Sequence, residues 1–194
     1  MKHRPMFFPL VMLNLALCGA AAGAPLAYDI DPHHSYPSFE ADHMGVSIWR
    51  GKFNKTTGKV VLDKEAGGGT VEVNVDLASI DFGHKQLNAW AIGPKFFNTA
   101  KFKQARYQAK LADFVNGTPT QAVGELTLRG VTRPLILKIN SFKCVPHPML
   151  KRELCGADAL GTFRRDEFGL DAGKEYGFNM DVTLRIQVEA VRSQ

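Results

Sequence analysis

The sequence has few cysteines, no long apolar run after its first residues, and none of the familiar catalytic motifs. Only two of its three cysteines lie beyond residue 24. No His-Glu-x-x-His pair, Gly-x-Ser-x-Gly elbow or glycine-rich phosphate loop occurs, so the usual signs of a metalloprotease, a serine hydrolase or a nucleotide-binding enzyme are missing. Beyond residue 17, no segment approaches the roughly 18 apolar residues that a membrane-spanning helix needs. These absences argue against a familiar enzyme and against stable membrane insertion.

The N-terminus has the three parts of a secretory signal peptide. Basic residues at the start precede an apolar run from Met6 to Leu17, and small residues follow as far as Ala24. We predict a signal peptide of residues 1–22, with cleavage after Ala24 as the alternative, and a periplasmic location. Cys18 could instead carry a lipid anchor, but Leu17 stands before it, where such a signal has a small residue.

The rest of the chain is mildly basic and of single-domain length. Removing Lys2 and Arg4 leaves 22 basic against 19 acidic residues, a formal net charge of +3. Such an excess does not require a nucleic acid as partner. We expect residues 23–194 to form one domain with one sizeable core.

Cys144 and Cys155 are the cysteines of the predicted mature chain. Exported proteins meet an oxidising compartment, so the simplest expectation is a disulfide between them. A closed loop of this length contributes about 3 kcal/mol in the chain-entropy view. The alternative, a metal site shared with His147, lacks the four well-spaced ligands of a structural zinc site.

Apolar and polar residues alternate along many segments, which predicts half-buried antiparallel strands. The alternation is clearest at Val71–Leu77, Leu126–Leu128, Leu135–Ile139 and Met180–Val188. Weaker strands are expected at Tyr36–His43, Val46–Phe53, Val60–Leu62, Tyr107–Phe114 and Leu160–Arg165.

Turn residues separate these strands, and in one segment the apolar residues follow a helical spacing instead. Asn54–Gly58 and Asn116–Pro119 are expected to be hairpin loops. Helical spacing between His84 and Phe102 predicts a short helical insert. Strands this one-sided must hide one face and protect their edges, so we predict an all-β, eight-stranded antiparallel barrel. The interior of such a barrel is either filled by side chains or holds one ligand.

Several of the 13 phenylalanines fall on faces expected to point inward. From composition alone, ordinary core packing is the favoured interpretation. His43 shares a face with Phe39, and a satisfied core histidine is favoured there over a metal site with His33 or His34.

Arg165 shares a face with Phe163, although a guanidinium turned into a barrel needs a partner. A salt bridge to Asp166 or Glu167 is favoured over an anionic ligand.

Four groups of residues occur in a characteristic order along the chain. They are Tyr28–Pro32 with His34 and Ser35; Phe39, His43, Gly45, Ser47, Gly51 and Phe53; Phe96 and Phe97 with Gly124–Pro134; and Arg165–Gly169. In this order they resemble the YceI-like family of periplasmic polyisoprenoid-binding proteins over nearly all of the predicted mature chain. The resemblance implies an extended, lipocalin-like eight-stranded barrel whose apolar tunnel binds a long isoprenoid, quinone or fatty-amide chain. It also suggests a possible homodimer.

The helical insert departs from the family pattern. Trp90 and Ala91 stand where a His-Leu pair is expected, and Lys103 stands where a proline usually follows Phe102. Because the insert borders the ligand in the family, these departures concern the headgroup end of the site.

We therefore expect a carrier or binding protein, not an enzyme, with no cofactor and a long apolar lipid as partner. The expected tunnel lining is Phe39, Trp49, Phe53, Leu126, Leu128, Phe163 and Phe168. Phe96, Phe97 and Phe102 are expected to cap the tunnel, and His43 and Arg165 to meet a headgroup or to fix the end of the barrel. The alternatives are an enzyme acting on such a lipid and a structural barrel with a packed core. A tunnel of several hundred Å³ would favour the carrier, in line with ordinary ligand pockets of roughly 300–1,000 Å³.

Overall fold

The protein is described by a computed structural model covering residues 23–194. The predicted signal peptide lies outside the described residues. Among those that are described, no helix is long and apolar enough to cross a membrane.

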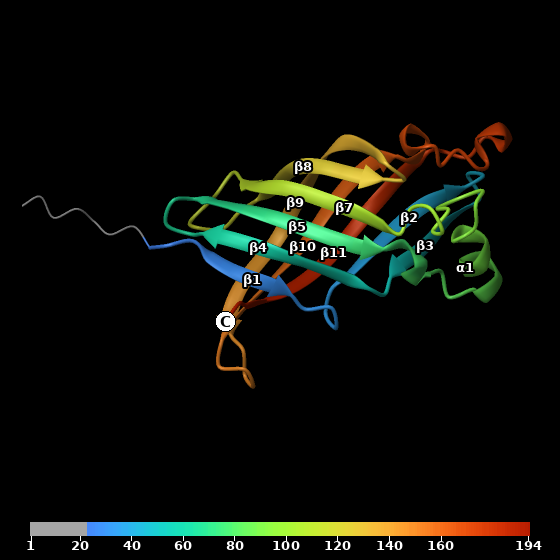
Figure 1. Cartoon of the computed structure of the whole chain (residues 1–194). Coiled ribbons are helices and arrows are strands. Elements are labelled where there is room, and N and C mark those ends of the chain that lie inside the picture. The colour runs from blue at the N-terminus through green and yellow to red at the C-terminus, as the bar shows by residue number, and fades with distance from the viewer. Residues whose placement is uncertain (1–22) are drawn as a thin grey trace, which may run out of the picture.

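The main body of the molecule is a closed antiparallel barrel (Figure 1). Its strands are β1 Leu26–Ile30, β4 Thr56–Asp63, β5 Gly68–Asp76, β7 Gln104–Ala112, β8 Gln121–Leu128, β9 Val131–Pro146, β10 Glu153–Arg164 and β11 Asp181–Arg192. Within residues 23–194 these eight strands pair in that order, and β11 pairs with β1 to complete the ring. The predicted fold class is confirmed.

Three short strands extend this barrel at one end: β2 Tyr36–His43, β3 Ser47–Phe53 and β6 Ile80–Asp81. β2 pairs with the first half of β11, β3 pairs with β2, and β6 pairs with the end of β3. Each short strand is separated from a barrel strand by a brief break in the chain. Ser35 lies at the first of these breaks, where its hydroxyl bonds both the carbonyl and the N–H of Glu189 on β11.

The break between β3 and β4 corrects one expectation from the sequence. Asn54–Gly58 is not a hairpin loop, because β3 and β4 do not pair with each other in the described structure. The chain only changes direction there, and Asn54 N–H bonds the carbonyl of Ser79, 3.0 Å away. The turn at Asn116 and Gly117, by contrast, does connect the paired strands β7 and β8.

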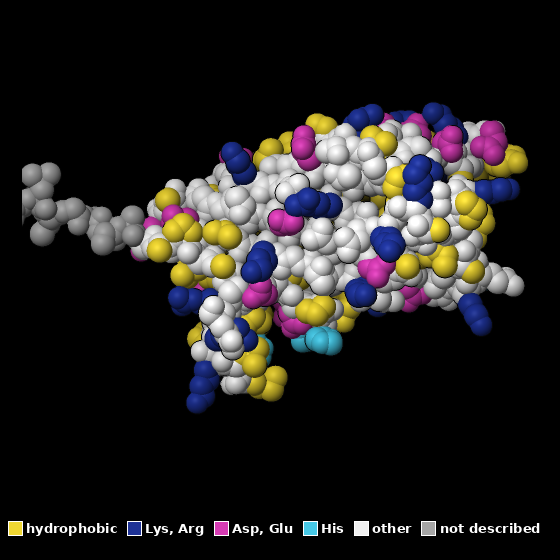
Figure 2. Space-filling model, viewed as in Figure 1, with side chains coloured by type: hydrophobic (Ala, Val, Ile, Leu, Met, Phe, Trp, Pro, Cys, Tyr) yellow, Lys and Arg dark blue, Asp and Glu magenta, His cyan; other side chains and the backbone are white. Residues whose placement is uncertain are grey.

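Period-two alternation sorts the side chains between the barrel interior and the solvent, as β7 shows most regularly. Ala105, Tyr107, Ala109 and Leu111 are buried, and the residues between them are exposed. On the outer face, Lys and Arg side chains stand close to Asp and Glu side chains (Figure 2). One such pair is Arg106 and Glu72, with 2.6 Å between charged atoms.

The predicted helical insert lies beside the three-strand extension, where the sheet does not close within residues 23–194. β6 and β7 do not pair in the described structure, and α1 (Lys85–Ala91) and the loop that follows it lie between them in the chain. The ring nitrogen of His84 accepts the N–H of Leu87 and caps the helix. Ala91 and Phe97 of the insert pack in one cluster with Ile80 on β6 and Ala105 on β7, so the insert fills the gap with side chains.

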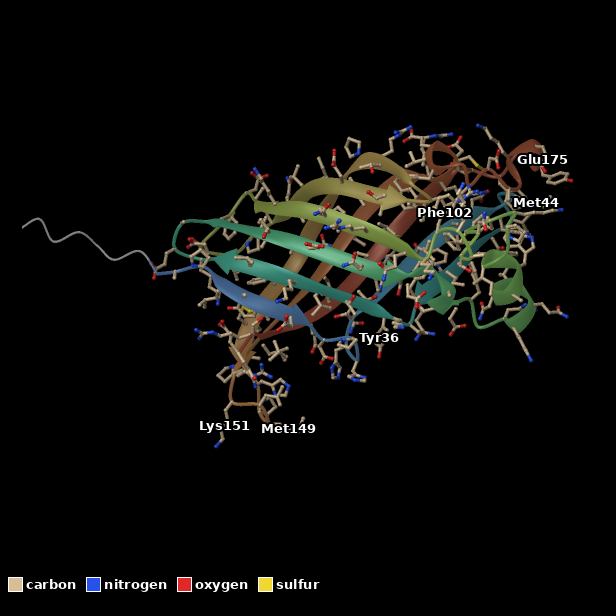
Figure 3. The ribbon with its side chains drawn as sticks, viewed as in Figure 1. Tyr36, Met44, Phe102, Met149, Lys151 and Glu175 are labelled. Atoms are coloured by element: carbon tan, nitrogen blue, oxygen red, sulfur yellow. A yellow bond between two sulfur atoms is a disulfide. The ribbon has the colours of Figure 1, made fainter. Side chains whose placement is uncertain are left out.

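The opposite end of the barrel is held by a covalent bond. Cys144 on β9 and Cys155 on β10 face each other in register and form the predicted disulfide. Beyond it, the β9–β10 loop carries Met149 and Lys151 away from the barrel, at the far end from Met44 and Glu175 (Figure 3).

Candidate ligand-binding site

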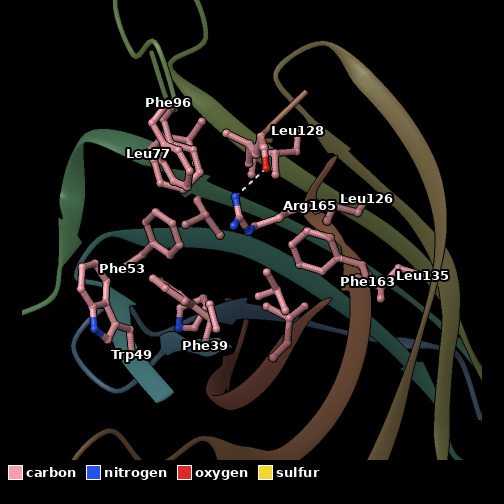
Figure 4. A pocket seen from close by; sticks show the side chains of 18 of the residues that line it. Phe39, Trp49, Phe53, Leu77, Phe96, Leu126, Leu128, Leu135, Phe163 and Arg165 are labelled. Carbon is pink, nitrogen blue, oxygen red and sulfur yellow. Dashed lines mark hydrogen bonds between the residues drawn. The ribbon is translucent and has the colours of Figure 1, made fainter. Parts of the chain in front are cut away.

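The barrel contains an apolar cavity of about 230 Å³ at the end that carries the insert. The predicted strands supply much of its wall, including Val73, Val75, Leu135, Leu137, Val182, Leu184 and Ile186. Figure 4 shows Phe39, Trp49, Phe53 and Phe96 on one side of this cavity, and Leu126, Leu128 and Leu135 of β8 and β9 with Phe163 on the other.

A second apolar cavity, of about 110 Å³, lies toward the disulfide end and is lined in part by Cys155. The two cavities share a set of lining residues, which are Pro37, Val73, Tyr107, Leu137 and Ile186. The first cavity is smaller than the tunnel expected from the sequence, and the shared residues separate it from the second.

Tyr107 is the largest side chain at this boundary and is held in place. Its hydroxyl lies 2.8 Å from the carbonyl oxygen of Ala122 and 3.1 Å from that of Leu135, so its one proton is shared between two neighbouring strands. Burial raises the pKa of Tyr107, which keeps the hydroxyl protonated as a donor.

Aromatic residues of β2 and β3 form one wall of the larger cavity. Phe39 and Phe53 have ring centroids 5.8 Å apart, and Phe39 packs edge-on against Phe82 at 5.4 Å. Gly51 makes this arrangement possible, because a Cβ there would lie 2.6 Å from the Phe39 ring. The glycine therefore lets Phe39 lie across β3.

The insert supplies the cap of the cavity. Trp90, Phe96 and Phe97 all line it, with ring centroids 4.9 Å apart for Trp90 and Phe96 and 4.8 Å apart for Phe96 and Phe97. Phe97 also packs edge-on against Phe53, which joins the cap to the wall. Trp90, which departs from the family pattern, is 44% exposed and lies at the mouth of the larger cavity.

Arg165 is the one arginine or lysine on the wall of either cavity in the described part of the chain. It is only 6% exposed and points in among Phe53, Phe163 and Leu128 (Figure 4). Its guanidinium donates to the carbonyls of Leu170 at 2.7 Å and Ala172 at 2.8 Å. Burial lowers the pKa of Arg165, against the opposing charges of nearby aspartates.

The salt bridge expected for Arg165 is not formed. Asp166 instead pairs with Arg164 at 2.9 Å and with Lys174 at 2.8 Å, and no salt bridge to Arg165 occurs within residues 23–194. A guanidinium has more N–H donors than two carbonyls use, so Arg165 keeps hydrogen-bonding capacity beside the cavity.

His43 does not line the cavity but supports a residue that does. Its ring stacks on that of Trp49, with centroids 4.1 Å apart and 10° between the planes, and packs edge-on against Phe178 at 5.0 Å. Trp49 lines the cavity and is 39% exposed. His43 thus orients one side of the cavity mouth.

Comparison with known proteins places this barrel in a family. The model of the YceI-like domain matches residues 28–190. This chain belongs to the YceI-like family. Among its curated relatives is the UPF0312 protein of Shewanella denitrificans, 30% identical over 200 residues that cover 98% of each chain. The UPF0312 protein of Serratia proteamaculans is 30% identical over 183 residues, 93% of each chain.

Solved structures show the same YceI-like fold. BcnA of Burkholderia cenocepacia aligns with a TM-score of 0.65 at 18% identity, over 82% of this chain and 98% of that one. A domain of Saccharophagus degradans described as polyisoprenoid-binding aligns with a TM-score of 0.61 at 17% identity, over 87% of this chain and 99% of that one.

The YceI-like barrel brings most of the predicted site residues together. Phe39, Trp49, Phe53, Phe96, Phe97, Leu126, Leu128, Phe163 and Arg165 line the larger cavity. Phe168 and Phe102 do not. Phe168 is 2% exposed and packs in the core, edge-on against Phe163, while the Phe102 ring lies against Gly130 and beneath the Arg129 guanidinium.

Other lining residues were not singled out from the sequence. They include Leu77, Phe82, Leu87 and Tyr107, whereas Phe178 was among the phenylalanines expected to point inward but was not predicted to line the tunnel. The strand signal was available for Tyr107, which lies in the alternating series Ala105, Tyr107, Ala109 and Leu111. Phe82 lies in a connecting segment of this YceI-like chain, where no period indicates which way a side chain points.

Proposed function

We propose that this protein is a periplasmic carrier that holds the tail of a long-chain isoprenoid, quinone or similar amphiphilic lipid inside its barrel. The observation that carries the proposal is the apolar cavity of about 230 Å³, walled by aromatic and aliphatic side chains, with one buried guanidinium at its side. Membership of the YceI-like family supports it, as does the fold shared with the S. degradans domain described as polyisoprenoid-binding.

The driving force in this proposal is burial of the lipid tail. Each methylene moved from water into the cavity contributes at most about 0.8 kcal/mol before the costs of binding are subtracted. No polar group of the protein loses a partner when Val73, Leu137 or Ile186 meets the tail. Affinity should therefore rise with tail length until the accessible space is filled.

Tyr107 would set how far the tail reaches. A tail confined to the larger cavity stops at the ring of Tyr107, and a longer tail enters the second cavity past the shared residues. Because hydrogen bonds to two strands hold that ring, entry requires the neighbouring aliphatic side chains to change rotamer.

Arg165 would meet the headgroup. Its guanidinium stays charged, faces an apolar space and is balanced by two backbone carbonyls but no salt bridge within the described chain. A phosphate, carboxylate or quinone oxygen at this position would accept the remaining donors. His43 keeps a supporting role behind Trp49.

The site is suited to binding more than to chemistry. Among residues 23–194, the lining of the larger cavity includes Arg165 and Asp42 but no histidine, cysteine or glutamate. Asp42 uses its carboxylate to accept N–H groups of Gly45 and Asn179, which is a structural task. We therefore propose no catalytic residue and no cofactor.

Native mass spectrometry of gently purified protein tests the proposal. We expect a lipid to co-purify, or a series of prenyl alcohols and quinones to bind with affinity that rises with tail length. A barrel that is consistently empty and takes up no isoprenoid would overturn the carrier function.

A matched pair of variants ties the result to the cavity. Ala41 lines the larger cavity, so Ala41→Trp should fill it and abolish uptake. Ala66 lies in an exposed turn outside both cavities, so Ala66→Trp should bind lipid as the unmodified protein does. Equal uptake by the two variants would place the lipid outside the barrel.

A further inference from the structure

The end of the barrel that carries the insert exposes apolar side chains around the cavity mouth. At the β2–β3 hairpin, Met44 is 53%, Val46 is 82% and Ile48 is 48% exposed. On the insert, Trp90 and Ile92 are 44% and 37% exposed. Exposed apolar residues are ordinary when scattered, but a group at the mouth of an apolar cavity indicates an interaction surface.

Two tryptophans join this surface to the cavity. Trp49 and Trp90 are both partly exposed and both line the cavity wall. The apolar lining of the cavity is therefore continuous with the exposed parts of these two side chains. We call Met44, Val46, Ile48, Trp90 and Ile92 the mouth surface.

The hairpin tip of the mouth surface has a large apolar residue in a left-handed backbone conformation. Met44 and Gly45 have φ angles of 60° and 69°, and the turn is closed by the bond from Val46 N–H to the His43 carbonyl at 3.0 Å. Asn, Asp or Gly is favoured in this left-handed conformation, and a large apolar side chain is not. A strained apolar residue that also points into water suggests a role outside the folding of the chain.

The insert adds positive charge to the same end of the molecule. From Phe82 to Lys103 the chain contains four basic residues and no acidic one. Lys85, Lys95, Lys101 and Lys103 are exposed, and none of them forms a salt bridge within residues 23–194. Figure 2 shows basic and apolar side chains, with some acidic ones among them, over the end that carries α1.

We propose that the mouth surface docks on the anionic face of a lipid bilayer, with the hairpin tip and Trp90 entering the interface. Apolar side chains flanked by lysines match such a surface in both respects, since headgroups attract the cations and the boundary with the acyl chains accepts the apolar groups. Docking would hold the cavity mouth against the bilayer, where its proposed ligand resides. The docking goes beyond the carrier function and can be tested without any carrier ligand.

The test is co-flotation of the full mature protein with vesicles that contain no isoprenoid. Vesicles of phosphatidylcholine with about a third phosphatidylglycerol should bind the protein, and pure phosphatidylcholine vesicles should bind it several-fold less. Raising the salt to about 1 M, where the Debye length is about 3 Å, should remove most of that difference.

Matched variants locate the surface. Val46→Glu should weaken vesicle binding about tenfold. Met149→Glu should leave it unchanged, because Met149 is equally exposed, at 81%, but lies on the loop at the other end. Met44→Asn should also weaken binding while raising the melting temperature, because asparagine tolerates the left-handed turn.

A second pair of variants isolates the charges. The double variant Lys85→Glu/Lys95→Glu should lose at least about 25-fold in binding to anionic vesicles, since each basic residue near such a surface contributes about fivefold. Lys138→Glu/Lys143→Glu, with the same charge change on β9, should lose much less.

Three results would overturn the proposal. One is a protein that does not float with anionic vesicles, and another is equal behaviour of the two members of either pair. The third is a dimer in light scattering that Val46→Glu dissociates, without vesicle binding, which would assign the mouth surface to a second copy of the chain. Because the vesicles carry no isoprenoid, each of these leaves lipid uptake by the cavity to be judged separately.

Discussion

The two ends of the molecule are closed in different ways. At the disulfide end, the wall is continuous, β1 pairs with β11, and Cys144 and Cys155 link β9 to β10. At the other end, the wall is open between β6 and β7 in the described structure, and aromatic side chains of the insert fill the opening. The larger cavity lies at the second end and the smaller one at the first.

This difference shows how a stable barrel can keep space inside it. Backbone pairing and a covalent bond constrain one end, so the other end need not be packed to full density. Rigid aromatic rings are suited to that role, because each has few rotatable bonds and a large surface. The predictions below test whether stability and ligand binding divide between packed and cavity-lining residues at the two ends.

The largest expected effect concerns Phe168, which the sequence predicted to line the tunnel and the structure places in the packed core. Phe168→Ala should reduce the free energy of unfolding by about 3–5 kcal/mol, the usual cost of removing a buried aromatic side chain. Phe39→Ala should reduce the free energy of unfolding less than Phe168→Ala does, because Phe39 already faces a cavity. It should reduce the affinity for lipid more. Urea unfolding and lipid titration of both variants measure this division. The reverse ranking would return Phe168 to the binding site.

The next effect concerns the disulfide end. Replacing both Cys144 and Cys155 with alanine should reduce stability by about 3 kcal/mol through the lost loop closure. For a chain of this size the melting temperature should fall by about 6–12 °C. Binding of short-tailed lipids should not change, because the larger cavity lies at the other end. Loss of short-tail binding in the folded double variant would show that the two ends are coupled.

The sequence predicted the strands better than it predicted the site. Alternation of apolar and polar residues identifies which strand residues face inward, and four residues that it places inward, Phe39, Phe53, Leu126 and Phe163, line the larger cavity. This alternation gives no information about residues beyond the end of a strand. β10 ends at Arg164, and Arg165–Phe168 forms a 3₁₀ turn, so Phe168 turns into the core instead of the cavity.

The sequence also could not predict which segments far apart in the chain come into contact. Asp166 is adjacent to Arg165 in sequence, yet Lys174 and Arg164 take its carboxylate, and the Arg165 side chain turns to the carbonyls of Leu170 and Ala172. The cavity volume could not be predicted for the same reason. It depends on how side chains from opposite strands meet, which no local pattern records.

A smaller effect is expected at the boundary between the two cavities. Tyr107→Phe removes one hydroxyl and should reduce stability by about 1 kcal/mol, since a single internal hydrogen bond contributes about that much. The freed ring should move more easily, so the variant should bind longer tails relative to short ones than the unmodified protein does. Thermal unfolding and a series of tail lengths provide the two measurements. An unchanged length profile would show that Tyr107 does not limit the tail.

The smallest effect concerns the acidic limb of the pH dependence at the insert end. Hydrogen bonds from Lys174 and Arg164 lower the pKa of the Asp166 carboxyl to about 2. A pKa lowered by folding means that the carboxylate stabilises the native state above the unfolded value of about 3.9 and that this contribution is lost as the pH falls from about 4 toward 2. The stability difference between the protein and Asp166→Asn should therefore shrink across this interval and stay constant from pH 5 to 8. A carboxyl resonance of Asp166 that titrates near pH 4 in NMR would contradict the pairing.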